Sequence, residues 1–214
     1  MIALLRYRFA LLGHSQRYLP PALVYVAALA AIYTDPTAPV PPEFAVSAGA
    51  LVVFACWLTV AALDLEDPVQ RLVTLSHARR PIALVTSSAL AVLVACVPLA
   101  LLSVGWAAWV HGGVPASALG AGLLAHLACA LAGIGVALPC SRLLVSRLGF
   151  TVATALGALT LVLLVRQVPL VNPLLRAMGR DAEFTGQAVL AVALSASALA
   201  VSLAVTSAVA ARRS

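Results

Sequence analysis

Six long apolar runs, each almost free of charge, constrain this chain more than any other feature. A helix needs roughly 20 mainly apolar residues to cross about 30 Å of hydrocarbon. The chain has 63% hydrophobic and only 9% charged residues, whereas a soluble domain keeps about a quarter of its residues charged. The sequence therefore predicts an all-α membrane protein, with one transmembrane domain over residues 1–214. The six predicted spans cover residues 20–34, 44–63, 82–109, 116–139, 150–165 and 187–211.

Arginine is distributed unevenly over the segments that connect these spans. Ten of the thirteen arginines fall in the two tails and in the loops 64–81 and 140–149, and three fall between residues 166 and 180. Cytoplasmic loops hold the excess of positive charge, so we expect both termini in the cytoplasm. The expected location is the cytoplasmic membrane of a bacterium. Because the chain has no lysine, it cannot form a G-x-x-x-x-G-K phosphate-binding loop.

Residues 1–19 predict an amphipathic helix that lies at the membrane surface. On a helical wheel its apolar side chains share one face and most of its basic ones share the opposite face, as in interfacial helices. Arg8 interrupts the apolar face, and a plain basic tail is the alternative. The apolar face holds Ile2, Leu5, Phe9 and Leu12, and the basic face holds Arg6, His14 and Arg17.

The loop 64–81 predicts a short cytosolic helix between two spans. Asp67 suits the N-cap, Pro68 suits the first helical position, and Arg79 and Arg80 lie where the helix dipole is negative. Leu72 and Leu75, three residues apart, make a small apolar face that fits a groove on a partner. An ordinary well-capped connector would have the same features.

The connection 167–186 is far more apolar than a loop in water should be. Pro169, Asn172 and Pro173 break it, and residues 174–178 can form one or two helical turns. Backbone of this kind persists at membrane depth only when it packs against protein. We therefore predict a re-entrant segment on the extracellular side, before the last span.

Catalytic and metal-binding patterns do not emerge from the sequence. The four cysteines have no ligand spacing, and the four histidines are scattered. Only His126 falls at mid-membrane depth, where an ionisable residue is a functional candidate. It predicts either a proton relay or substrate contact, or, as the favoured alternative, a neutral imidazole bonded to a Ser or Thr of a neighbouring span. Small residues at Gly149, Ala153 and Gly157 predict a close helix–helix contact.

In arrangement, the chain resembles the membrane subunit of a type-two ATP-binding cassette transporter. The resemblance lies in the N-terminal connecting helix, the acid-led loop beginning Glu66-Asp67-Pro68-Val69-Gln70-Arg71-Leu72, and the broken apolar excursion before the last span. It implies a permease subunit, itself not an enzyme, that exports an amphipathic or lipophilic substrate. The loop would dock on a cytosolic ATPase that binds ATP and Mg²⁺, and this chain would hold no cofactor. The implied ATPase contacts are Glu66, Asp67, Gln70, Arg71, Leu72 and Leu75.

The resemblance also implies a second permease copy or paralogue, paired through the first and fifth spans, with substrate moving along that seam. Ala153 and Gly157 lie in the fifth span, and Gly149 directly precedes it. Membrane lipid is the surrounding partner, and no nucleic-acid partner is expected. Two alternatives remain open, namely an ion-coupled carrier or channel that acts alone through His126, and a structural or regulatory membrane protein that transports nothing.

Overall fold

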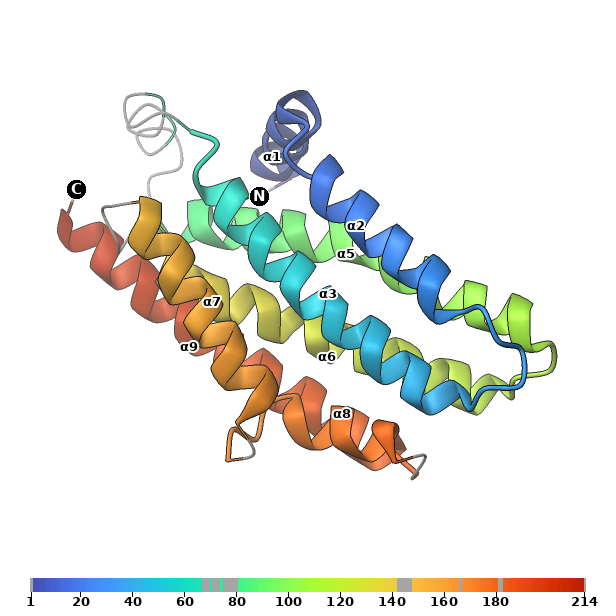
Figure 1. Ribbon diagram of the computed structural model, residues 1–214. Helices are drawn as coiled ribbons and strands as arrows, with labels where there is room; N and C mark the ends of the chain where they lie inside the picture. The colour runs from blue at the N-terminus through green and yellow to red at the C-terminus, as the bar shows by residue number, and fades with distance from the viewer. Residues whose placement is uncertain are drawn as a thin grey trace.

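The computed structural model describes residues 2–66, 70, 74, 81–141, 148–165, 167–180 and 183–213. All regular secondary structure within these residues is helical (Figure 1). The elements are α1 (Ile2–Ser15), α2 (Leu19–Ile32), α3 (Val40–Leu63), α5 (Pro81–His111), α6 (Ala116–Cys140), α7 (Leu148–Leu164), α8 (Asn172–Gly179) and α9 (Thr185–Arg213).

Four of these helices, α3, α5, α6 and α9, are long and apolar enough to cross a membrane. This confirms a membrane-embedded, all-α protein. Two further apolar helices, α2 with 14 residues and α7 with 17 residues, extend for only about 21 Å and 26 Å. Both fall short of a hydrocarbon core of about 30 Å, so the six-span topology stays a prediction. The helix bounds agree with the six apolar runs to within a few residues.

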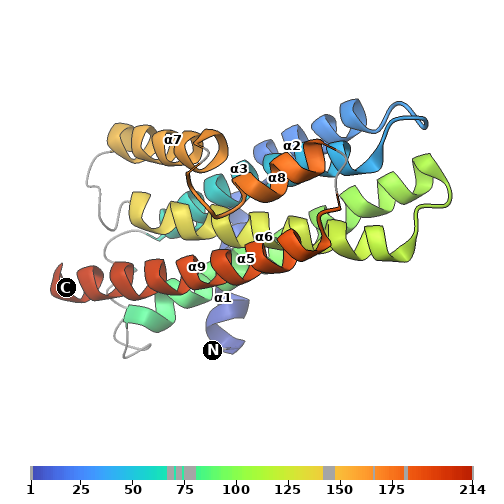
Figure 2. The ribbon, with the colours of Figure 1, turned by 90° about the horizontal axis from the view of Figure 1, so that it is seen from below.

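Helix α6 is the centre of the bundle and packs against α3, α5 and α9. Glycines bring its backbone close to its neighbours. A Cβ atom at Gly133 would collide with the backbone carbonyl of Val52 on α3, and one at Gly122 would lie 2.6 Å from the ring of Phe44. Small residues allow such close approach between helices in membranes. Figure 2 shows α9 following α6 along most of its length.

The periphery is formed by helices that keep much of their apolar surface exposed. Only 17% of the most apolar 18-residue stretch of α9 is buried, and α7 exposes Phe150, Leu156 and Leu164. An exposed apolar surface of this extent would aggregate in water, but it is the surface that lipid requires. These helices therefore present the lipid-facing side of the molecule.

Helix α8 occupies the apolar connection before α9, where the sequence predicts a helical turn or two. Leu174 and Met178 are buried, and Leu175 lies 3.9 Å from the position of a Cβ atom on Gly49 of α3. Asn172 ties α8 to α7, because its side-chain amide donates to the carbonyl of Leu163 (2.5 Å). The segment thus packs along α3 instead of extending into solvent.

The bundle has two distinct ends. Where α3 ends and α5 begins lie α1 and the end of α9, and we call this the α1 end (Figure 1). At the other, which we call the α8 end, the short connections 33–39 and 112–115 join α2 to α3 and α5 to α6. Helix α1 packs against α5.

Candidate functional site

A buried ion pair at the α1 end joins α1 to the loop that follows α3. The guanidinium of Arg8 donates to the carboxylate of Glu66 over 3.1 Å, and each side chain is only 3% exposed. Thr74 donates to the other carboxylate oxygen over 3.2 Å. Nearby, the amide of Gln70 donates to the hydroxyl of Tyr7 over 2.9 Å. Two separate contacts therefore fix α1 to this loop.

This pair explains why Arg8 interrupts the apolar face of the N-terminal helix. Arg8 and Leu12 are the buried residues of α1, whereas Ile2 and Phe9 are exposed. Burying a guanidinium is costly unless it is paired, and Glu66 supplies the countercharge. The face of α1 that packs against the rest of the protein is thus centred on the charged side chain of Arg8.

The loop residues predicted to contact an ATPase have different positions. Glu66 is engaged within the chain by Arg8 and Thr74. Gln70 is exposed, and its amide is bonded to Tyr7. The remaining four, Asp67, Arg71, Leu72 and Leu75, lie outside the described residues.

His126 is fully buried on α6 and uses both ring nitrogens. Its Nδ1 lies 2.7 Å from the carbonyl oxygen of Gly122, and its Nε2 lies 3.1 Å from the hydroxyl of Ser47 on α3. A carbonyl can only accept, so Nδ1 carries the proton. In the neutral ring Nε2 then accepts the proton of Ser47. The structure thus brings His126 to a serine of a neighbouring span.

The contact between His126 and Ser47 is part of a longer chain of hydroxyl groups. The hydroxyl of Tyr33, just after α2, lies 3.1 Å from the Ser47 hydroxyl and 2.9 Å from the hydroxyl of Ser103 on α5. If Ser47 donates to His126, then Tyr33 donates to Ser47 and Ser103 donates to Tyr33. One chain of hydrogen bonds therefore links four segments of the bundle and satisfies its buried polar groups.

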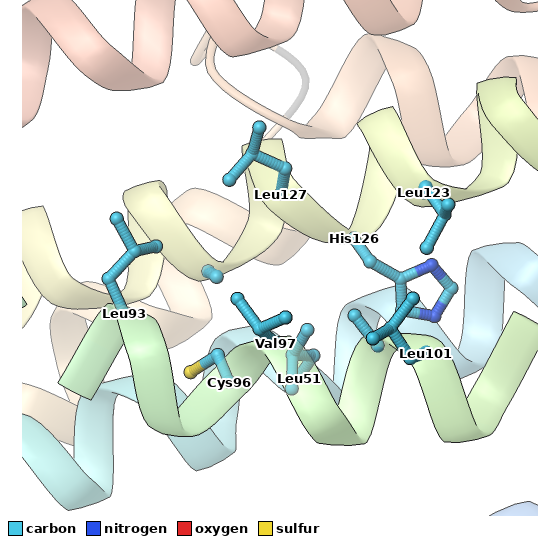
Figure 3. Close-up of a pocket in the computed structure, with 10 residues that line it drawn as sticks. Leu51, Leu93, Cys96, Val97, Leu101, Leu123, His126 and Leu127 are labelled. Atoms are coloured by element: carbon cyan, nitrogen blue, oxygen red, sulfur yellow. The ribbon is translucent and has the colours of Figure 1, made fainter. Parts of the chain in front are cut away.

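A cavity of about 240 Å³ lies beside His126, between α3, α5 and α6 (Figure 3). In Figure 3 the His126 ring lies next to Leu101 and Leu123. The walls are almost entirely aliphatic. They include Leu51, Cys96, Val97, Leu101, His126 and Leu127.

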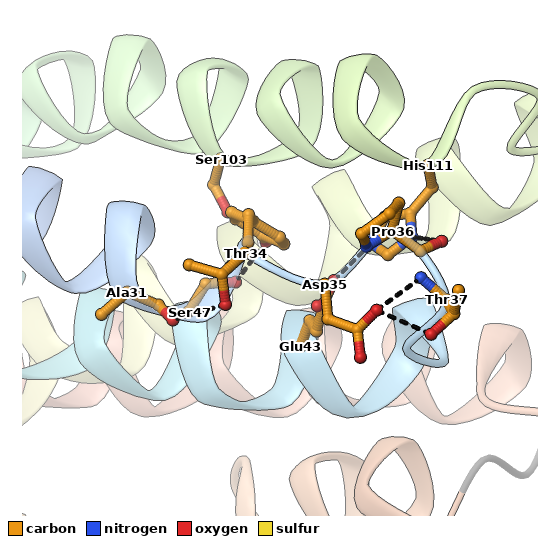
Figure 4. A network of polar contacts seen from close by, with 10 residues as sticks. Ala31, Thr34, Asp35, Pro36, Thr37, Glu43, Ser47, Ser103 and His111 are labelled. Carbon is orange, nitrogen blue, oxygen red and sulfur yellow. Dashed lines mark hydrogen bonds and ion pairs between the residues drawn. The ribbon is translucent and has the colours of Figure 1, made fainter.

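A second buried ion pair lies at the α8 end (Figure 4). Nε2 of His111, the last residue of α5, lies 2.6 Å from a carboxylate oxygen of Glu43 on α3, and the two side chains are 5% and 9% exposed. The other ring nitrogen lies 3.1 Å from the carbonyl oxygen of Pro36. Both partners of the ring are acceptors when Glu43 is ionised, so the geometry suits an imidazolium. The pair ties α3 to α5, and the contact with Pro36 ties the connection 33–39 to α5.

The three small residues of the predicted seam lie on an exposed face of α7. Gly149, Ala153 and Gly157 are all exposed, and a Cβ atom at either glycine would meet no atom within 4 Å. The stripe therefore makes no close contact inside the described chain and is free to meet another molecule.

No metal centre is found in the part of the chain that the structure describes. No group of three or more His, Cys, Asp and Glu side chains comes together there. The four cysteines are buried as free thiols. Burial and the apolar surroundings suit them as small core residues.

Sequence reasoning missed three features of these sites. Arg8 was seen only as a flaw in a pattern, and neither Glu43 with His111 nor Tyr33 with Ser103 was singled out. A signal for the second pair exists, because Glu43 and His111 stand at the same end of two neighbouring spans.

Comparison of the chain with models of protein families, with curated proteins and with solved structures finds no match.

Proposed function

We propose that this chain is the permease subunit of a type-two ATP-binding cassette transporter in the cytoplasmic membrane of a bacterium. It exports an amphipathic or lipophilic substrate, and the ATP and Mg²⁺ are bound by a separate cytosolic ATPase. In this proposal α2 and α7 complete six spans together with their flanking residues. The α1 end then faces the cytoplasm, as the arginine distribution favours.

One observation carries the proposal, namely the buried ion pair between Arg8 of α1 and Glu66 in the acid-led loop. Mechanical coupling needs a rigid element through which the movement of a partner reaches the spans. A partner that displaces this loop also displaces α1, because Arg8 is paired with Glu66. It displaces α3 as well, because α3 ends at Leu63, three residues before Glu66. Because α1 packs on α5, the displacement reaches three helices of the bundle together.

The assignment of ATPase contacts becomes narrower when the ion pair is taken into account. Glu66 serves the internal link, so its carboxylate positions the loop, and Gln70 does so through Tyr7. The direct contacts then fall to Asp67, Arg71, Leu72 and Leu75. In the same proposal the exposed stripe of Gly149, Ala153 and Gly157 pairs with a second permease copy or paralogue.

The test is co-purification from the native host in mild detergent, followed by mass spectrometry of the bound proteins. We expect a stoichiometric ATPase with the unaltered chain and its loss with Asp67→Arg. The matched control is Asp35→Arg, which reverses an exposed acid at the α8 end and should leave the ATPase bound. Absence of any nucleotide-binding partner from the unaltered chain contradicts the proposal.

A second candidate function, an ion-coupled carrier that acts alone, has one observation in its favour. The hydrogen-bonded chain from Ser103 to His126 lies in the same bundle seam as Glu43 and His111, since Glu43 precedes Ser47 by about one turn of α3. Such a seam offers titratable groups from one end to mid-depth. This candidate predicts uptake driven by a proton gradient in vesicles without ATP, abolished by His126→Gln.

A further inference from the structure

The cavity beside His126 lies at the middle of the spans. Its walls come from residues 93–101 of α5 and 123–130 of α6, with Leu51 of α3 behind them. Residue 96 is the midpoint of α5, which runs from Pro81 to His111. At that depth the molecules around a membrane-spanning helix are the ends of lipid acyl chains.

The mouth of the cavity opens between α5 and α6. Val97 and Leu101 of α5 and Leu127 of α6 line the cavity and are also exposed. In Figure 3 Val97 projects from α5 toward α6. A molecule in the bilayer can therefore reach the interior sideways, without passing through water.

The chemistry of the walls excludes a polar ligand segment. The polar side chains among the lining residues are those of Cys96 and His126. Both nitrogens of His126 are engaged, with Gly122 and with Ser47, and a thiol is a weak donor. Any polar group inside would lose its water without gaining a strong partner, which is costly.

The dimensions suit a chain better than a fused ring system. The lining residues of α5 are spread over residues 93–101, which is about 12 Å of helix. An extended hydrocarbon chain can lie along a wall of this length. A more compact apolar cavity of about 150 Å³ accommodates benzene, so the volume here is sufficient for several methylene groups.

We propose that this cavity binds one linear hydrocarbon chain of an amphipathic molecule, which enters from the bilayer between Val97, Leu101 and Leu127. The inference rests on the proposed export function, for which it narrows the cargo to molecules that carry an unbranched acyl or alkyl chain. Inside the cavity each methylene makes van der Waals contacts with the aliphatic walls, and the polar head stays outside the cavity at the membrane surface.

The experiment uses the full chain alone in phosphatidylcholine vesicles that contain a phosphatidylcholine with a diazirine at the end of one acyl chain. After photolysis, mass spectrometry maps the crosslinked residues. We expect labelling of residues 93–101 and 123–130 to saturate as the probe fraction rises. Labelling of the exposed Leu190 and Val201 on α9 should rise linearly, because those residues meet only bulk lipid.

A pair of matched variants tests the entrance. Val97→Trp narrows the mouth and should remove the saturable part of the cavity labelling. Val201→Trp makes the same change on exposed α9 and should leave it unaltered. Because Val97 is exposed, the first variant is expected to fold, and unchanged labelling elsewhere on the chain verifies this.

Three results would overturn the proposal. Cavity labelling could rise linearly like that of α9, Val97→Trp could have no effect, or a diazirine sterol could label the cavity where the acyl probe does not. The experiment contains no ATPase, so its outcome is independent of co-purification. Saturable labelling without a co-purified ATPase would refute the permease proposal and support the chain-binding cavity. A co-purified ATPase with linear labelling of the cavity would support the permease proposal and refute the chain-binding cavity.

Discussion

Among the described residues, each end of the bundle has one buried ion pair, and the two pairs differ in their cation. At the α1 end a guanidinium, Arg8, meets Glu66, and at the α8 end an imidazole, His111, meets Glu43. A guanidinium keeps its charge at every pH that a protein survives, whereas an imidazole changes its charge near neutrality. One link is therefore permanent, and the other depends on pH.

Because of this difference, the two ends of the bundle are suited to different mechanical roles. A permanent pair between α1 and the loop after α3 suits an element that must transmit force. A titratable imidazole that ties α3 to α5 through Glu43, and the connection 33–39 to α5 through Pro36, suits an element that can loosen. The comparison makes three predictions, from the largest expected effect to the smallest.

Arg8→Met has the largest expected effect because it leaves Glu66 buried without its countercharge. Breaking one partner of a buried pair costs about 3–5 kcal/mol, and both side chains here are 3% exposed. We expect the free energy of unfolding, measured by titration with a denaturing detergent, to fall by about that amount.

The control for Arg8→Met is the double variant Arg8→Met with Glu66→Met. Replacing both members of a buried pair by apolar side chains is often neutral or stabilising, so stability should recover. Co-purification of the ATPase should nevertheless be weakened, because the link that positions the loop is gone. A double variant as unstable as Arg8→Met alone would show that the loss of stability does not come from the unpaired charge of Glu66.

His111→Gln has a smaller expected effect at the α8 end. Glutamine retains a donor for Glu43 or for the Pro36 carbonyl but carries no charge, and one buried acceptor loses its partner at about 1–3 kcal/mol. In the unaltered protein both ring nitrogens of His111 face acceptors, the Glu43 carboxylate and the Pro36 carbonyl, and this favours the protonated ring in the folded state. The stability of the unaltered protein should therefore fall as the pH rises through the neutral range and the ring loses one of its two donors.

The decisive measurement compares the pH dependence of unfolding in the unaltered chain and in His111→Gln. We expect a decline between about pH 6 and pH 8.5 in the first and a flat profile in the second. Arg8→Met should keep the declining profile, since it leaves the α8 end intact. A decline that persists in His111→Gln would assign the pH dependence to another group.

The sequence predicted helices better than the contacts between them. Long apolar runs specify spans because the backbone must satisfy its own hydrogen bonds in lipid, and the run 116–139 corresponds closely to α6. Apolar content alone does not fix which helix is central. The close approaches of Gly122 and Gly133 to α3 depend on packing that no local pattern specifies. The stripe on α7 that the pattern favoured makes no close contact with the rest of the described chain.

Much of the candidate site was beyond reach of the sequence for a similar reason. Helical periodicity marks Arg8 as misplaced, and only the long-range contact with Glu66, 58 residues away, shows why it is buried. His126 was recognisable because a lone imidazole at mid-depth is rare. Its partners Ser47, Tyr33 and Ser103 were not, because hydroxyls in spans commonly bond to their own helix, as Thr59 does to Ala55.

The smallest expected effect concerns Asp35, which lies in the connection that His111 holds. The hydroxyl and the backbone amide of Thr37 donate to one oxygen of Asp35 over 2.6 Å and 2.9 Å, and these bonds lower the pKa of the Asp35 carboxyl below its usual value. Because the pKa is lowered, this local contact stabilises the connection at pH values above the usual pKa of an aspartate. The stabilisation is lost as the pH falls through the lowered pKa of the folded state. Thr37→Val should raise the pKa, and Thr37→Ser should not, as followed by NMR of the carboxyl carbon. Equal pKa values in both variants would show that the Thr37 hydroxyl does not set the charge of this connection, leaving the pH response of the α8 end to His111 alone.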